Sequence, residues 1–115
     1  MKGAFQLAEH LSLGVSRRRR ATVVTVAGEV DVASGPELQH AIEGALTDSD
    51  KRDLVIDLRE VGFIDVAGMR TLLVAHDRAQ KAGRRLLVIN VPAPARRLLE
   101  LTQADKILNL AKLPR

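Results

Sequence analysis

Four stretches of this chain have the residue pattern of β-strands. Phe5 to Val15 alternates partially between apolar and polar residues, and Ala21 to Ala27 is rich in β-branched residues. Leu54 to Leu58 and Leu86 to Val91 are almost continuously apolar, which is typical of strands buried on both faces. These stretches are therefore expected to form one sheet.

Two helices are predicted by apolar residues at helical spacing. The first carries the stripe from Leu38 to Leu46, and it is expected to start at Ser34, which would cap it while Glu37 reaches back in a capping box. The second is expected to start at Asp65 as its cap and to end at Gly83. The first helix follows a loop that begins at Gly28, and the second follows the short apolar stretch from Val61 to Ile64.

Glycine and proline divide the rest of the chain. Gly28 is expected to end the second strand, and Gly62 to turn the chain, so that Val61 to Ile64 is a separate short stretch. A third helix follows Pro92, and the tail from Ala104 is expected to add a last short element. Strands alternating with helices predict an α/β fold, and 115 residues suffice for one domain over residues 1–115.

The composition is that of an ordinary globular domain, with 46% hydrophobic and 28% charged residues. No apolar run approaches the roughly 18 residues of a membrane helix, so membrane insertion is not expected. Because the chain has no cysteine, disulfides and thiolate metal sites are excluded, and a cytoplasmic location is the expectation.

The net charge of +4 raises the question of nucleic-acid binding. Acidic residues are spread among the basic ones, and the two Phe, without Tyr or Trp, offer no platform for stacking bases. We therefore expect no nucleic-acid partner. Arg17 to Arg20 is interpreted as a solvated hairpin loop, with a docking patch for an anionic surface as the alternative.

No group of residues predicts catalysis or cofactor binding. His10, His40 and His76 belong to three separate elements, and neither a P-loop nor a dinucleotide fingerprint is present. Asp57 and Asp65 lie near the carboxyl ends of predicted strands, but a turn and a helix cap account for them. The chain is therefore predicted not to be an enzyme and to need no cofactor and no metal.

Three segments in sequence order resemble the STAS family of anti-sigma factor antagonists: Gly28 to Asp31, Leu54 to Leu58, and Phe63 to Leu73. Arg96 to Thr102 is similar to the last helix of that family, and the resemblance extends over about residues 5–110. It implies the STAS fold, a central mixed sheet of four to five strands with helices packed against it.

The resemblance also implies a mechanism. Such domains bind an anti-sigma factor that is also a serine-protein kinase, and phosphorylation of a serine in an Asp-Ser-Ser-Gly-like turn breaks the complex. Here the turn reads Asp65-Val66-Ala67-Gly68, so Ala67 occupies the phosphoacceptor position and carries no hydroxyl. Ser34 and Thr71 are substitute acceptors in principle, but a helix cap and helix packing are the better interpretations.

The family's partner-binding surface is carried over to two segments of this chain. Val66, Ala67 and Met69 would supply apolar contact, and Asp31 and Arg70 a polar rim. Met69 has a second interpretation as a core residue, and Gly68 is expected to allow close approach or backbone freedom. The full set of expected partner-binding residues is Asp31, Ser34, Asp65, Val66, Ala67, Gly68, Met69 and Arg70.

The predicted function is an anti-sigma factor antagonist-like binding module that regulates sigma-factor-dependent transcription and lacks the usual phosphoacceptor. The alternative is a STAS accessory or scaffold subunit of a transporter or signalling complex. A basic nucleic-acid-binding domain is a third class, which steep salt dependence of binding would reveal. Self-association is left open.

Overall fold

The computed structural model describes residues 11–47 and 52–111. They form one five-stranded sheet in the order β1-β2-β3-β4-β5, in which β1 and β2 are antiparallel and the other neighbours parallel. The predicted α/β fold with a mixed sheet is thus confirmed. The strands are β1 (Leu11–Arg17), β2 (Ala21–Val30), β3 (Asp53–Ile64), β4 (Leu86–Ile89) and β5 (Leu110–Ala111).

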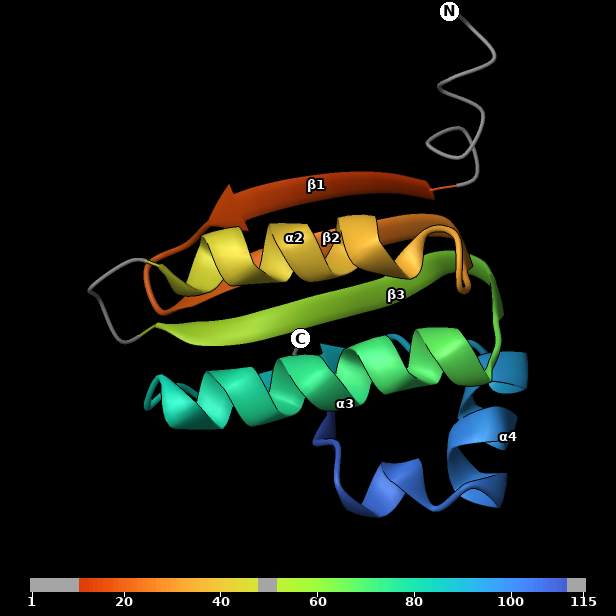
Figure 1. Ribbon diagram of the computed structural model, residues 1–115. Coiled ribbons are helices and arrows are strands. Elements are labelled where there is room, and N and C mark those ends of the chain that lie inside the picture. Colours follow the sequence, from red (N-terminus) through yellow and green to blue (C-terminus); the bar gives the residue numbers. More distant parts are fainter. Residues whose placement is uncertain (1–10, 48–51, 112–115) are drawn as a thin grey trace, which may run out of the picture.

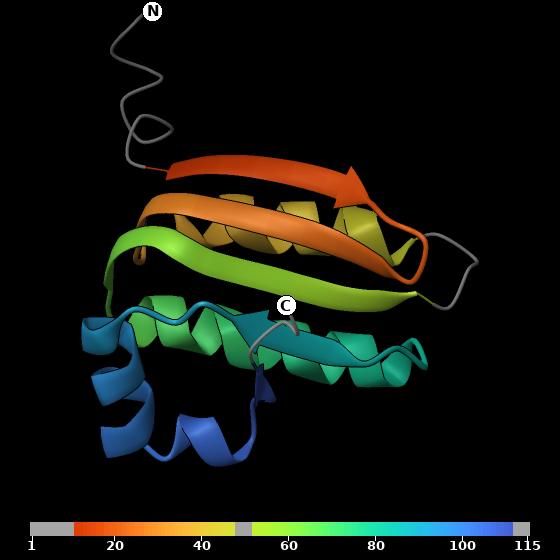
Figure 2. The ribbon, with the colours of Figure 1, turned by 180° about the vertical axis from the view of Figure 1, so that it is seen from behind.

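Helices cover one face of this sheet. α2 (Gly35–Leu46) and α3 (Val66–Lys81) lie side by side on it in Figure 1, whereas Figure 2 shows the opposite face without a helix over it. α4 (Ala93–Leu101) and the short 3₁₀ helix η2 (Ala104–Lys106) lie beyond the β4 side of the sheet. No helix among the described residues is both long and apolar enough to cross a membrane.

The core lies between the sheet and α2 and α3. The central strands contribute fully buried branched side chains to it, and the helices supply the apolar stripes that the sequence predicts. These side chains include Val24, Val26, Leu54, Ile56, Leu58, Leu38, Ile42 and Leu72.

Both glycines expected to interrupt strands lie inside them. β2 continues through Gly28 (φ 101°) to Val30, and β3 continues through Gly62 to Ile64 without a turn. Thr25 pairs with Asp57 but Ala27 with Glu60, and Gly28 pairs with Val61 but Glu29 with Phe63. β3 thus takes up an extra residue at two bulges, and the second bulge is at Gly62. Because a bulge lets the ladder continue past an unpaired residue, neither glycine ends its strand.

The remaining boundaries differ less. The predicted first strand begins later, at Leu11, and its Phe5 to His10 part lies outside the described residues. β4 ends at Ile89 because Asn90 adopts a left-handed conformation with φ 54°. Arg17 to Arg20 are exposed around the β1–β2 hairpin, as predicted.

The end of α3 follows the predicted glycine signal. Gly83 has φ 72°, its N–H donates to the carbonyl oxygen of Gln80 at 3.0 Å, and the N–H of Arg84 donates to that of Ala79 at 2.9 Å. This is the Schellman arrangement, which satisfies the last helical carbonyls.

The Arg84 side chain then turns inward and is only 4% exposed. Its Nε donates to the carbonyl oxygen of Arg52 and its Nη1 to that of Ala45 in the last turn of α2, each at 2.7 Å. The cation lies at the negative end of the α2 dipole and links the segment after α3 to the end of α2 and the residue before β3.

Candidate functional site

The helices α2 and α3 begin at the same edge of the sheet, where β2 and β3 end. Val30 and Ile64, the last residues of these strands, are paired, and the N–H of Asp65 donates to the carbonyl oxygen of Val30 at 3.3 Å. The loop that begins at Asp31 and the first turn of α3 therefore meet at the right-hand end of Figure 1.

The loop after β2 is held by Asp31 and Ser34. Oδ1 of Asp31 accepts from the N–H groups of Ala33 and Ser34, each at 3.0 Å. Oγ of the buried Ser34 donates to the carbonyl oxygen of Glu29 at 2.6 Å and accepts from the N–H of Asp31 at 3.0 Å. Ser34 occupies the N-cap position of α2, but the predicted capping box with Glu37 is wrong, because the hydroxyl is bonded into the preceding loop instead.

The first turn of α3 is held by Asp65 and Gly68. The Asp65 side chain accepts from the N–H of Gly68 at 2.9 Å, which confirms it as the helix cap. A Cβ at Gly68 would lie 2.2 Å from the carbonyl oxygen of Val30, so only glycine allows this approach to the end of β2. The close-approach interpretation of Gly68 is confirmed.

The expected contact residues divide into exposed and buried ones. Val66 is 45% exposed, Arg70 is exposed, and Asp31, Asp65 and Ala67 are partly exposed. Met69 is 8% exposed in the hydrophobic core, and its sulfur accepts from Oγ1 of Thr102 at 2.9 Å. The structure thus places Met69, like Gly68 and Ser34, beneath the surface rather than on it.

Two exposed apolar side chains at this edge were not among the expected residues. Val32, in the loop after β2, is 77% exposed, and Phe63, near the end of β3, is 50% exposed. Phe63 also borders a small cavity with Pro92 and Pro94. The sequence places Val32 in a loop and Phe63 in a short apolar stretch, but the pattern does not show that their side chains are exposed. We call Asp31, Val32, Asp65, Val66, Ala67 and Arg70 the helix-start surface.

Comparison with known proteins identifies the fold family. Residues 13–111 match the family described as Mlab, STAS domain. The chain belongs to the STAS domain family. The resemblance that the sequence motifs indicate is therefore confirmed.

Several relatives of this STAS domain are described as anti-sigma factor antagonists, and two of them match most of this chain as follows. The crystal structure of an anti-sigma factor antagonist from Mycobacterium paratuberculosis has a TM-score of 0.78 and 31% identity, covering 87% of this chain and 84% of that chain. The anti-sigma F factor antagonist of Paenibacillus polymyxa is 22% identical over 99 residues, 86% of this chain and 85% of that protein.

The same fold also occurs within a much larger protein. Murine Solute Carrier 26 family member A9, an anion transporter in the inward-facing state, has a TM-score of 0.71 and 16% identity, covering 83% of this chain but 16% of that chain. This likeness concerns the fold alone.

The two substitute hydroxyls of this STAS domain are not presented to solvent. Ser34 is buried, as described above, and Thr71 is buried in α3, where its Oγ1 donates to the carbonyl oxygen of Ala67 at 3.2 Å. A Cβ on Gly35 would lie 2.8 Å from that Oγ1, so α2 is packed directly over it.

The described histidines and Asp57 lie in separate parts of the fold. His40 is exposed on α2, His76 is half-buried on α3 with no partner for Nδ1, and His10 lies outside the described residues. Asp57 lies within β3 rather than in the predicted turn, and its Oδ1 accepts from Asn90 Nδ2 at 3.1 Å. Residues 11–47 and 52–111 contain no cluster of three or more potential metal ligands.

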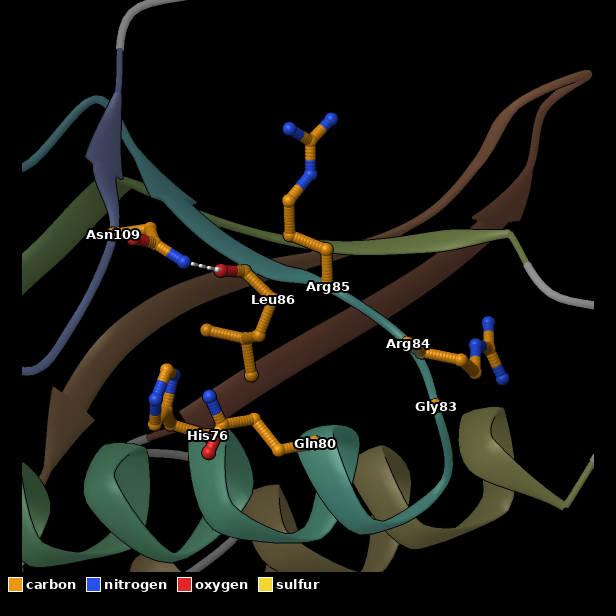
Figure 3. Close-up of a pocket in the computed structure, with 7 residues that line it drawn as sticks. All are labelled: His76, Gln80, Gly83, Arg84, Arg85, Leu86 and Asn109. Carbon is orange, nitrogen blue, oxygen red and sulfur yellow. Dashed lines mark hydrogen bonds between the residues drawn. The ribbon is translucent and has the colours of Figure 1, made fainter.

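A hollow of about 510 Å³ beside α3 is lined by His76, Gln80, Gly83, Arg84, Arg85, Leu86 and Asn109 (Figure 3). His76 and Gln80 point toward β4, but the side chains of Arg84 and Arg85 lead away from them. Arg85 instead bonds to Asp53 at 2.7 Å, and this hydrogen bond and the charge of Asp53 raise the pKa of Arg85. The hollow lies away from the helix-start surface, toward the carboxyl-terminal end of α3.

Proposed function

We propose that this STAS domain is an anti-sigma factor antagonist, which binds an anti-sigma factor and thereby regulates sigma-factor-dependent transcription. The observation that carries the proposal is the helix-start surface, where the Asp31 loop and the first turn of α3 are tied together by the Asp65–Val30 hydrogen bond. The two relatives described above as antagonists support it, since each matches most of this chain.

The chemistry of this surface suits protein binding. Val32 and Val66 are exposed and small, and burial of such apolar side chains drives association. Arg70 and the partly exposed Asp31 and Asp65 give a charged rim, which sets register and specificity more than affinity. We propose that the domain acts in the cytoplasm as a binding module, without catalytic activity or cofactor.

The position of Ala67 determines how such a complex would be regulated. It follows Val66 in the first turn of α3, where the amino-terminal dipole tolerates negative charge. With alanine there, a serine kinase finds no acceptor, and the two nearby hydroxyls are buried. We propose that the partner is a kinase-type anti-sigma factor and that phosphorylation at position 67 does not switch this antagonist off.

The proposal is tested by affinity capture from lysate of the source organism, with ATP present. Wild-type bait is expected to capture an anti-sigma factor, identified by mass spectrometry, and to remain unphosphorylated. Ala67→Glu bait should lose this prey but keep its circular dichroism spectrum, because the new carboxylate lies at a helix amino terminus. Equal capture by both baits would overturn the surface assignment.

The regulatory part is tested by restoring a hydroxyl. With the captured kinase and ATP, Ala67→Ser is expected to gain about one phosphate (roughly −1.5 to −2 charges at pH 7) and to bind at least about tenfold more weakly. The matched control is Ala93→Ser, the same substitution at the exposed first position of α4. Phosphorylation of wild type, or an unchanged affinity of phosphorylated Ala67→Ser, would contradict the proposal.

The alternative is an accessory or scaffold subunit of a transporter or signalling complex. This alternative is supported by the likeness in fold between this chain and part of an anion transporter. Because the helix-start surface has no phosphoacceptor at position 67, the domain could stay bound to such a complex without being released by phosphorylation. Capture of a transport protein in place of an anti-sigma factor, with the same sensitivity to Ala67→Glu, would establish this alternative.

A further inference from the structure

β1 forms one edge of the sheet in the described part of the chain. β1 is the first strand of the sheet order, and no described strand pairs with its outer side (Figure 2). Natural edge strands are usually protected by proline, central charges or bulges. β1 has none of these: its register with β2 is continuous from Leu11 to Arg17, and its only charge is at the end, on Arg17.

The register shows which backbone groups face outward. The N–H of Arg18 donates to the carbonyl oxygen of Ala21 at 2.7 Å, and these residues continue the β1–β2 register. Hydrogen-bonded and non-bonded pairs alternate along an antiparallel ladder. The N–H and C=O groups of Ser12, Gly14 and Ser16 therefore point to β2, and those of Leu13 and Val15 point outward.

Gly14 lies at the centre of this strand, and the isolated domain does not explain it. A Cβ there would meet only Cβ of Thr25, at 4.0 Å, which is ordinary contact. Its φ is not positive, so its backbone does not call for glycine either. Glycine weakens a strand interior, because it has no side chain to pack against its neighbours.

We propose that β1 pairs antiparallel with β1 of a second copy of this chain, about a two-fold axis at Gly14. This register places Leu13 opposite Val15 of the second copy, and both are residues whose backbone groups point outward. Ser12 then lies opposite Ser16, and Leu11 opposite Arg17. In this register the central apolar residues of one copy, Leu13 and Val15, lie opposite those of the other, and the serines lie opposite serines.

The two faces of the pairing agree with the two faces of the sheet. Leu13 and Val15 pair with Val26 and Val24, which are in the core, so they lie on the helix-covered face. Val15 is 54% exposed and would be covered by Leu13 of the second copy. Apolar cross-strand pairs of this kind stabilise a sheet, and the serines remain together on the open face.

The proposed dimer does not depend on the proposed function. The antiparallel pairing would continue the sheet through both copies and reverse one relative to the other. The helix-start surfaces would then lie at opposite ends of the assembly, where each could bind its own partner.

Disulfide formation tests the axis directly, because the chain contains no cysteine. At the axis two copies of Gly14→Cys would form a non-hydrogen-bonded pair, with Cα atoms about 4.5 Å apart, within the range of a disulfide. We expect air oxidation of the full chain at micromolar concentration to give a covalent dimer on a non-reducing gel.

Matched cysteines test the register. Two copies of Ser16→Cys would be about 13 Å apart along the strand and should not cross-link. A mixture of Ser12→Cys and Ser16→Cys should form the mixed disulfide, since these positions face each other. Equal cross-linking of Ser16→Cys alone and Gly14→Cys would refute the register.

Light scattering tests the dimer without cysteine. Wild type is expected to be dimeric, and Val15→Lys should raise the dimer dissociation constant at least about tenfold. Val74→Lys, the same change at another exposed valine, should leave it unchanged. A monomeric wild type with no Gly14→Cys cross-link would overturn the proposal. The same result is expected if another segment of the same chain covers this edge, and it would overturn the proposal equally.

Discussion

Adding one methyl group at Gly68 is expected to force apart the two segments that build the helix-start surface. In Gly68→Ala, the new Cβ would lie 2.2 Å from the carbonyl oxygen of Val30, 2.8 Å from its carbonyl carbon and 2.9 Å from Cγ1 of Ile64. Two of these atoms are backbone atoms of a paired strand, which no rotamer change can move. Overpacking of this kind costs about 3 kcal/mol at its upper range.

Alanine also favours the helix over glycine by up to about 1 kcal/mol, which offsets part of this cost. The net expectation is a loss of about 2 kcal/mol in the free energy of unfolding. Gly44→Ala in α2 is the matched control, because nothing lies within 4 Å of its added Cβ. That variant should gain about 0.5–1 kcal/mol, so the same chemical change should have opposite signs at the two positions.

Urea unfolding followed by circular dichroism measures both variants. With a slope of about 1–3 kcal/mol per molar urea, the midpoint of Gly68→Ala should fall by roughly 1 M. A Gly68→Ala midpoint equal to that of Gly44→Ala would refute the reasoning, since it would mean that the first turn of α3 does not approach Val30 so closely. A changed slope would indicate a changed compactness instead.

Two further substitutions test the contacts around the helix ends. Arg84→Ala should lower the free energy of unfolding by about 2–4 kcal/mol, because the carbonyl groups of Ala45 and Arg52 lose buried donors; an unchanged urea midpoint would show that water replaces them. Asp65→Ala should cost about 1 kcal/mol by removing the cap on the Gly68 N–H, and Asp65→Asn should recover most of it. Equal thermal midpoints for the two Asp65 variants would contradict the capping role.

Local signals account for the elements that the sequence predicted correctly. Asp65 caps α3 and Gly83 ends it, because capping bonds and a left-handed residue act within one or two turns. The stretch from Leu54 to Leu58, apolar except at Asp57, is buried on both faces except at that residue. The STAS assignment likewise depended on motifs that the chain carries in order.

Predictions that depended on a neighbouring strand were less successful. Gly28 and Gly62 resemble chain breakers when read alone, but pairing between β2 and β3 accommodates them, the second in a bulge. Ser34 was expected to bond with the first turn of α2, but Glu29 and Asp31 compete for the same hydroxyl. Neither outcome is encoded in the periodicity of a single segment.

The sequence by itself determined the α/β order, the family and the absence of a hydroxyl at Ala67, because these depend on residue identity and short-range spacing. Tertiary structure alone decided which residues reach the surface: Met69 is in the core, whereas Val32 is exposed. It also decided the inward course of Arg84, whose acceptors lie on other elements. Burial and long-range hydrogen bonds depend on how separate elements pack, and a one-dimensional pattern does not contain that information.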